Sequence, residues 1–152
     1  MDLRPELLPP PVSRRRLDEL ALAVEWIEAL LDRGERAQAQ DAVVAFNAVT
    51  GHTYTLDDFA TWSGWRSLEE FACEAARPAR PKVPGVTRAE LAEIARRTMG
   101  ASPETDYYLR LLEANVPHPR VGDLVFHPPA ELLGASAEAV VDAALGYRAI
   151  AL

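Results

Sequence analysis

The residues best suited to do chemistry lie between His118 and Pro128, where the chain reads His-Pro-Arg-Val-Gly-Asp-Leu-Val-Phe-His-Pro. Prolines at both ends lack backbone N–H donors and Gly122 relaxes the backbone, so about one helical turn fits between Asp123 and His127. One turn cannot bury all of its apolar side chains. The pattern therefore predicts that the Asp123 carboxylate and at least one ring face solvent, as in an anchor for a protein partner.

Two other interpretations of these residues remain open from the sequence. The stretch could be a buried connector between two helices. His118, Asp123 and His127 could also ligate a metal ion, but their spacing around two prolines is unlike that of zinc sites, and we expect no metal. A histidine that precedes a proline, as His118 precedes Pro119, more often holds its own turn by a hydrogen bond.

The elements that must position this stretch are predicted to be helices throughout, which makes the fold class all-α. Apolar residues recur at intervals of three and four, and Ser or Thr followed three residues later by an acid marks several helix starts. The predicted helices span 17–33 and 35–49, and further helices follow Thr55, Ser67, Thr87, Ser102-Pro103 and Ser136. Val43, Val44 and Phe46 are predicted core residues of the second helix.

The predicted helix after Ser102 has an apolar inner face that includes Tyr108, Leu111 and Leu112. Its other face carries a ridge of an acid, an apolar residue, a base and an acid: Asp106, Leu109, Arg110 and Glu113. This ridge is either an ordinary solvent-exposed surface or the second half of a binding patch that begins at Asp123.

The distribution of proline predicts two regions, 1–82 and 86–152. Residues 1–13 are proline-rich, and we interpret them as an extended or disordered arm. Residues 77–85 contain three prolines and form the best candidate for a linker, in which we place the domain boundary. Residues 1–82 form a helical N-terminal region of unknown role.

Composition and charge exclude several classes of protein. The 152-residue chain has 49% hydrophobic residues, as globular proteins do, and a formal net charge of -7, which opposes nucleic-acid binding and favours a basic partner. No apolar run is long enough to cross a membrane, and Pro9–Pro11 stand where an export signal needs its apolar core. The single cysteine, Cys73, forms no internal disulfide, which fits a cytoplasmic location.

No arrangement of residues predicts catalysis. The sequence has no Gly-rich phosphate loop, no paired metal-binding cysteines and no nucleophile elbow. We therefore expect a protein that is not an enzyme and that holds no cofactor.

The stretch with its flanks resembles the immunity proteins of DNase-type colicins and pyocins. Their signature is His-Pro, three variable residues and Asp-Leu-Ile-Tyr-Tyr-Pro; here His118-Pro119 precedes Asp123-Leu124-Val125-Phe126-His127-Pro128 at the same spacing. The flanking helices agree in order, from Thr87 to the Tyr147-Arg148-Ala149 ending. The resemblance covers residues 86–152 and not the first half.

The resemblance implies a distorted four-helix fold in residues 86–152 and a role as a cytoplasmic inhibitor of a cognate toxin nuclease of the HNH DNase kind. Family members bind beside the nuclease active site and exclude DNA. Carried over by position, the shared anchor comprises Asp123, Phe126 and His127, where Phe126 and His127 replace the family's paired tyrosines. The residues that would set partner choice are Thr105, Asp106, Leu109, Arg110 and Glu113.

An alternative from another class is a helical adaptor or regulatory module. In that case the aromatic-rich first half, with Tyr54, Phe59, Trp62 and Trp65 close together in sequence, would be the working surface. A small core explains these four residues better than a base-stacking platform, because few basic residues lie among them.

Overall fold

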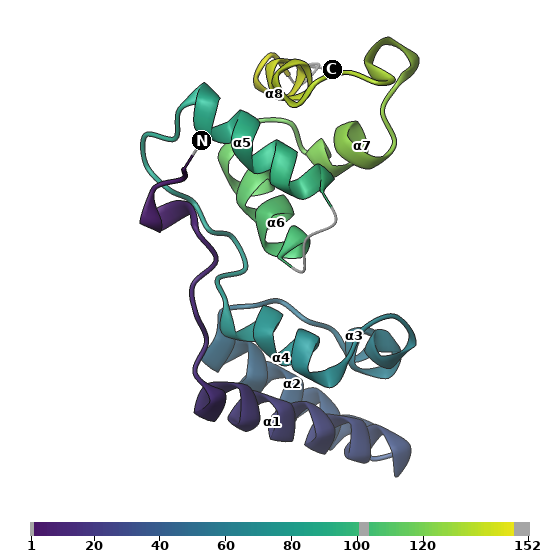
Figure 1. Cartoon of the computed structure of the whole chain (residues 1–152). Helices are drawn as coiled ribbons and strands as arrows, with labels where there is room; N and C mark the ends of the chain where they lie inside the picture. Colours follow the sequence, from purple (N-terminus) through teal and green to yellow (C-terminus); the bar gives the residue numbers. More distant parts are fainter. Residues whose placement is uncertain (1, 101–103, 148–152) are drawn as a thin grey trace. The chain divides into compact units, whose positions relative to one another are not determined.

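The computed structural model describes residues 2–100 and 104–147, and within these residues the chain is helical without strands (Figure 1). The prediction of an all-α fold is confirmed. The elements are η1 (Pro5–Leu7), α1 (Arg14–Asp32), α2 (Arg36–Thr50), α3 (Leu56–Thr61), η2 (Trp62–Gly64), α4 (Leu68–Ala76), α5 (Arg88–Met99), α6 (Thr105–Asn115), α7 (Val121–Phe126), η3 (Ala130–Leu132) and α8 (Ala137–Leu145). None of the helices in the described ranges is long and apolar enough to span a bilayer.

The helix starts follow from local side-chain capping. Thr55, Ser67 and Thr87 each accept a hydrogen bond from the backbone N–H three residues on, and the acid there accepts one from the cap's own N–H. The predicted capping boxes at Ser67 and Thr87 and the predicted N-cap at Thr55 are confirmed. Ser136 caps α8 through the N–H of Ala139. Ser102 and Pro103, predicted to begin α6, lie outside the described residues.

The chain divides into two compact units. The N-terminal unit is Pro10–Ala79, and the C-terminal unit combines Met1–Pro9 with Arg80–Leu152. The division after Ala79 lies within the 77–85 segment that the prolines mark as a linker. The first nine residues differ from the prediction, because they group with the C-terminal unit rather than with the helices that follow them.

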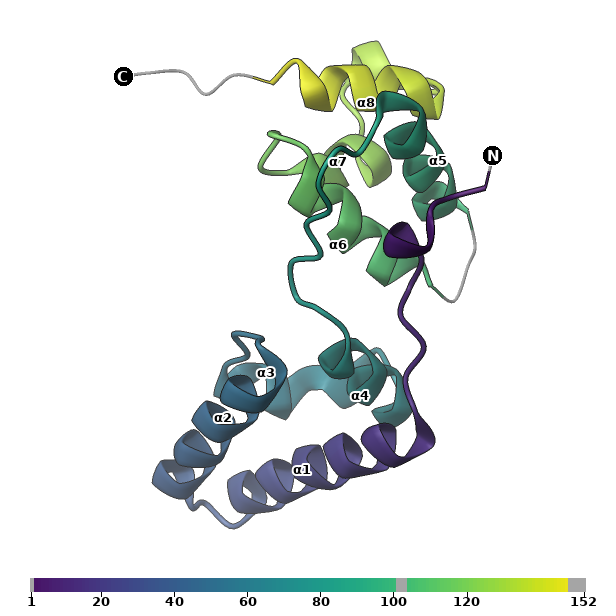
Figure 2. The ribbon, with the colours of Figure 1, turned by 90° about the vertical axis from the view of Figure 1, so that its left-hand side faces the viewer.

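In the N-terminal unit, α1 packs along α2 and α4, and the short α3 contacts both α1 and α2 (Figure 2). Phe59 and Phe71 lie at the centre of the core, with ring centroids 5.4 Å apart. Trp62 is buried with them, whereas Trp65 is 66% exposed. The prediction that Val44 is a core residue is wrong: Val43 and Phe46 face inward and Val44 is exposed, because adjacent helix positions are turned about 100° from each other.

In the C-terminal unit, α5 packs against α6 and α8, and the short α7 contacts all three of these helices. Ile94, Leu111, Leu112 and Val141 are fully buried between them. This packing is compatible with the four-helix architecture that the family resemblance implies.

The first residues of the chain complete the core of the C-terminal unit, where an extended or disordered arm was predicted. Residues 5–7 form the 3-10 helix η1, which lies beside α5 (Figures 1 and 2). Leu3 and Leu7 are buried in the same cluster as Leu91 and Leu111, and Leu7 is fully buried. The sequence pattern missed this contact because no local periodicity reports burial against residues more than 80 positions away.

Arg4 joins this N-terminal segment to α5 through the Glu90 carboxylate. Its Nε donates to Glu90 Oε2 at 2.7 Å, and its Nη2 donates to Oε1 at 3.2 Å and more weakly to the Pro84 and Gly85 carbonyls. The Glu90 side chain is only 6% exposed, so this bidentate contact is shielded from water on the carboxylate side. The hydrogen bonds from Arg4, followed by the bond from the Thr87 backbone, hold the pKa of Glu90 below its usual value.

These lowered pKa values predict that acid destabilises the C-terminal unit. The Arg88 guanidinium likewise lowers the pKa of Asp142, which it meets at 2.6 Å. A carboxylate with a lowered pKa in the folded state stabilises the fold at pH values above its ordinary pKa, which is 4.5 for Glu90. This stabilisation is lost as the pH falls through the lowered pKa of the folded state. We expect the denaturant concentration at half-unfolding to decrease as the pH is lowered below 4.5, and to decrease less in the Arg4→Met variant than in the wild type. Equal decreases in the two proteins would contradict the role of the Arg4–Glu90 pair.

Candidate functional site

The short helix α7 presents Asp123, Phe126 and His127 to solvent. All three are exposed, and the Phe126 side chain is 49% exposed, although Val121 at the start of the helix is fully buried. Asp123 and Phe126 stand at positions i and i+3, which share one face of a helix, and His127 is the residue directly after α7. Leu124 and Val125 pack partly against the core, which holds the helix on the unit.

The residues around α7 fix its position. His118 Nδ1 accepts a hydrogen bond from the Arg120 backbone N–H at 2.9 Å, and the His118 ring packs on Tyr147 with centroids 4.7 Å apart. This is the turn-holding contact expected of a histidine before proline. The helix ends where the His127 N–H donates to the Asp123 carbonyl, directly before Pro128. No side chain caps the start of α7, so the Asp123 carboxylate is not used as a helix cap.

The second part of the candidate surface lies on α6. Asp106 and Glu113 are exposed, and Thr105, Leu109 and Arg110 are half-buried. Thr105 is turned toward the helix start, where its hydroxyl donates to the Gly100 carbonyl at 3.1 Å.

Leu109 and Gly122 connect the two helices. A Cβ placed on Gly122 would lie 3.5 Å from Leu109 Cδ1, which is ordinary van der Waals contact. The backbone of α7 therefore rests close to the Leu109 side chain, and this contact is why Leu109 is half-buried instead of standing fully exposed in the predicted ridge. The helix contacts place α6 and α7 next to each other, as the binding-patch interpretation requires.

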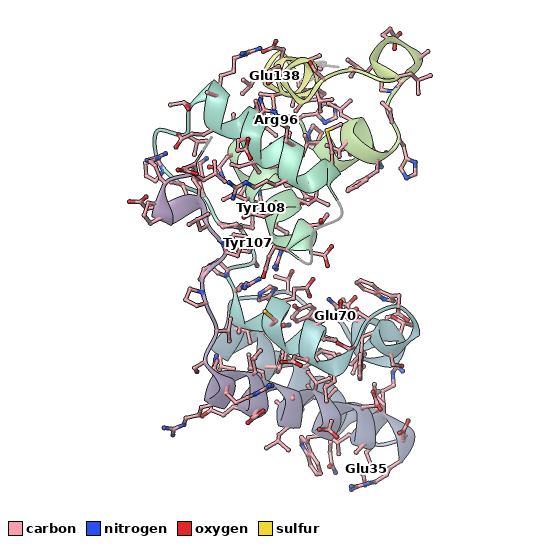
Figure 3. All side chains as sticks on the ribbon, in the orientation of Figure 1. Glu35, Glu70, Arg96, Tyr107, Tyr108 and Glu138 are labelled. Atoms are coloured by element: carbon pink, nitrogen blue, oxygen red, sulfur yellow. The ribbon has the colours of Figure 1, made fainter. Side chains whose placement is uncertain are left out.

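Charged groups on α6 perturb one another. Loss of part of its hydration to the surrounding protein raises the pKa of the Glu113 carboxyl, although the residue is exposed, and the positive charges of Arg80 and Arg110 act in the opposite direction. The Arg110 guanidinium lies 5.8 Å from the centroid of the Tyr107 ring. Tyr107 and Tyr108 are both buried on α6 (Figure 3). Only Tyr108 was predicted to be buried; the signal for Tyr107 was its position four residues before Leu111, on the same face of the helix.

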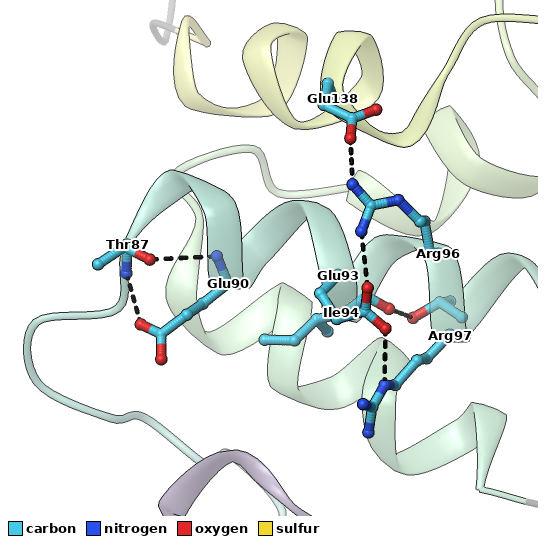
Figure 4. A network of polar contacts seen from close by, with 8 residues as sticks. Thr87, Glu90, Glu93, Ile94, Arg96, Arg97 and Glu138 are labelled. Carbon is cyan, nitrogen blue, oxygen red and sulfur yellow. Dashed lines mark hydrogen bonds and ion pairs between the residues drawn. The ribbon is translucent and has the colours of Figure 1, made fainter. Parts of the chain in front are cut away.

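A polar network holds α5 to its neighbours and so supports the surface (Figure 4). Glu93 on α5 accepts from Arg96 at 2.6 Å and from Arg97 at 2.9 Å. Arg96 also pairs with Glu138 on α8, and Arg97 donates to the Tyr108 hydroxyl on α6 at 3.0 Å. These contacts cross between three helices, so they fix the orientation of α6 relative to α5 and α8.

The described side chains of this surface offer binding groups: a carboxylate, two exposed rings and a mixed ridge. In the parts of the chain that the structure describes, no group of three His, Cys, Asp or Glu side chains is close enough to hold a metal ion. The arrangement defines a small helical domain that exposes a carboxylate and two rings next to a mixed ridge.

Comparison with known families is consistent with this class. Residues 86–150 match the family model described as colicin immunity protein / pyocin immunity protein, so the resemblance seen in the sequence is confirmed for this segment. The match supports a role in bacteriocin immunity in general. No curated protein and no solved structure matched the chain.

Proposed function

We propose that this protein is an immunity protein that binds and inhibits a cognate bacteriocin nuclease, of the HNH DNase kind, in the cytoplasm. It acts by binding and not by catalysis. The observation that carries this proposal is the solvent exposure of Asp123 and Phe126 on α7 and of His127 directly after it, within the segment that the family match includes. A buried connector, the other interpretation of this stretch, would have hidden these side chains.

The proposed binding face comprises α7 as the anchor and the outer face of α6 as the part that selects the partner. Phe126 supplies an apolar ring, and Asp123 supplies a charge that is not used to cap α7. On α6, the selective positions are Thr105, Asp106, Leu109, Arg110 and Glu113. Their mixture of acid, apolar group and base can discriminate between partners through both attraction and repulsion.

The proposed mechanism is to occupy an exosite beside the nuclease active site. A nuclease surface that holds DNA is basic, and the net charge of this chain is -7. An acidic protein bound next to that surface repels the phosphate backbone and overlaps its path. The bound nuclease would therefore lose DNA while its own catalytic groups stay uncovered.

A direct test uses purified HNH DNase domains of colicins and pyocins, tried one by one against the full-length protein. Fluorescence anisotropy should show that the full-length protein displaces a DNA duplex from the nuclease, and calorimetry should show that the nuclease still binds its active-site metal in the complex. Loss of metal binding would contradict the exosite, whereas failure to form a complex or to protect cells that express the toxin would contradict the immunity function.

Charge complementarity also predicts a salt-dependent rate of association. Long-range attraction between an acidic inhibitor and a basic nuclease speeds encounter at low ionic strength, while dissociation depends on short-range contacts. We expect the association rate constant to fall at least about tenfold between 20 and 500 mM NaCl, with a much smaller change in dissociation, as measured by stopped-flow fluorescence. An association rate that is independent of salt would show that charge does not guide the encounter.

A further inference from the structure

The two units of this chain follow the same order of elements. Each has two longer helices, a six-residue helix, a 3-10 turn and a nine-residue helix: α1, α2, α3, η2 and α4 in one, and α5, α6, α7, η3 and α8 in the other. The nine-residue helix is capped by a serine in both cases, Ser67 and Ser136. A shared order of this length, with matching lengths of the last two helices, is the first sign that the units are related.

The helices also pack in the same pattern within each unit. The first helix of each unit makes its most extensive contacts with the second and the fourth, α1 with α2 and α4, and α5 with α6 and α8. The six-residue helix touches the first and second helices in both units. The agreement therefore concerns tertiary packing and not only the order of helices along the chain.

A histidine occupies the same structural place in both units. His52 follows the end of α2, and its Nε2 lies 2.7 Å from the carbonyl oxygen of Arg77, the residue after α4. His118 follows the end of α6, and its ring packs on Tyr147, just beyond the end of α8. In each unit the histidine thus connects the start of the short-helix segment to the end of the fourth helix. Asp58 and Asp123 then both stand third in their six-residue helices.

We propose that Pro10–Ala79 is a second copy of the four-helix immunity fold, and that its short-helix end binds a second basic nuclease domain. This inference rests on the proposed function, because it extends that partner class to the other unit. It assigns a role to the part of the chain that the family match at residues 86–150 does not cover.

The second surface has its own aromatic anchor, Trp65. This side chain is 66% exposed, and the Arg66 guanidinium lies 4.3 Å from the centroid of its ring. Arg66 is in turn fixed from within, because it lies 4.2 Å from the ring centroid of buried Phe71 and pairs with Glu74 at 2.8 Å. A large exposed ring held in place beforehand loses little conformational freedom on binding, which favours its use as an anchor.

The charge of the N-terminal unit selects the kind of partner. Residues 10–79 contain 12 acidic and 7 basic side chains, a net charge of -5. Asp57, Glu69 and Glu70, close to Trp65 in sequence, are exposed acids. An acidic surface around an exposed tryptophan complements a basic protein surface.

The two surfaces differ in their carboxylates. The Asp58 carboxylate accepts a hydrogen bond from the Thr55 backbone N–H at 2.8 Å as part of the capping box, whereas α7 has no side-chain cap. Asp58 is therefore committed to its own helix start and is not the equivalent anchor. The second surface depends on Trp65 instead, and we expect it to bind the nuclease more weakly than α7 does.

The test counts nuclease domains on the full-length chain by calorimetry and sedimentation, with the HNH DNase domain of a colicin or pyocin that this protein binds as the probe. We expect two domains per chain in the wild type. Trp65→Ala should weaken the second binding event at least about tenfold and leave the first unchanged. Trp26→Ala is the matched control, because Trp26 is a 51% exposed tryptophan on α1 of the same unit with an arginine over its ring, and it should keep both events.

The outcomes separate this inference from the proposed function. One nuclease domain per chain, with equal affinity in the Trp65→Ala and Trp26→Ala variants, would overturn the second site while leaving immunity through α7 intact. If Asp123→Ala or Phe126→Ala abolished all nuclease binding while Trp65 was intact, α7 would be the one site, and the inference would also be overturned. If the Phe126→Ala variant still bound one nuclease domain, and the double variant Phe126→Ala/Trp65→Ala bound none, the second site would be supported.

Discussion

Replacing Leu7 with alanine should lower the free energy of unfolding of the C-terminal unit by about 2–5 kcal/mol, as is usual for a buried leucine whose cavity does not collapse. Leu7 is fully buried in the cluster formed with α5 and α6. Its segment also carries Arg4, the partner of the nearly buried Glu90 carboxylate. Loosening the segment would therefore expose core and leave that carboxylate without its cation, which adds to the loss.

Leu8→Ala provides a matched control for this prediction. Leu8 is the next residue, has the same side chain and is 39% exposed, so the same truncation should cost less than about 1 kcal/mol. Hydrogen exchange of α5 and α6 amides, read by mass spectrometry, would report the stability of this unit separately from that of Pro10–Ala79. Equal exchange rates in the Leu7 and Leu8 variants would show that the first residues do not belong to the folded unit.

The same contacts affect how the immunity function can be tested. A fragment that begins at residue 83 lacks Leu3, Leu7 and Arg4. It also lacks Pro81, whose carbonyl accepts a hydrogen bond from Asn115 Nδ2 on α6 at 3.0 Å. Such a fragment is expected to be less stable than the whole protein, so failure of the fragment to protect cells would not speak against the α7 surface. Substitutions in the full-length chain avoid this ambiguity.

Alanine at Asp123 or at Phe126 should weaken binding to the cognate nuclease by about 2 kcal/mol or more each, which corresponds to about 30-fold in dissociation constant. The Phe126→Ala variant would lose a ring that can fill a pocket on the partner. The Asp123→Ala variant would lose a charge that can pair with a basic residue of the partner. Both side chains are exposed in the unbound protein, so the substitutions should leave its own stability within about 0.5 kcal/mol.

Controls of the same chemistry exist on the N-terminal segment of the same unit. Asp2→Ala removes an exposed acid, and Leu8→Ala removes an exposed apolar side chain; neither belongs to the proposed face. Calorimetry should show near-native affinity for both. If the Asp123 and Phe126 variants also bound with native affinity, α7 would not be the anchor, and the family motif would have been carried over to the wrong surface.

Local interactions explain why much of this fold was visible in the sequence. The capping boxes at Thr55, Ser67 and Thr87 involve residues three positions apart, so the chain specifies them without reference to the rest of the fold. The same holds for the hydrogen bond that His118 accepts from the Arg120 N–H, and in part for α7 between Pro119 and Pro128, which begins at Val121 and ends at Phe126 where a turn from Asp123 to His127 was predicted. The order and ends of most helices follow from such contacts.

What the sequence by itself determined was the all-α class, the helix starts, and the motif that marks residues 86–150 as immunity-like. Only the tertiary structure decided that Leu7 belongs to the C-terminal core, that Val44 faces solvent, and that Leu109 rests on the backbone of Gly122. The physical reason is range. Capping and turn formation act over three or four residues, whereas burial depends on which distant surfaces meet, and no short stretch of sequence encodes its partner.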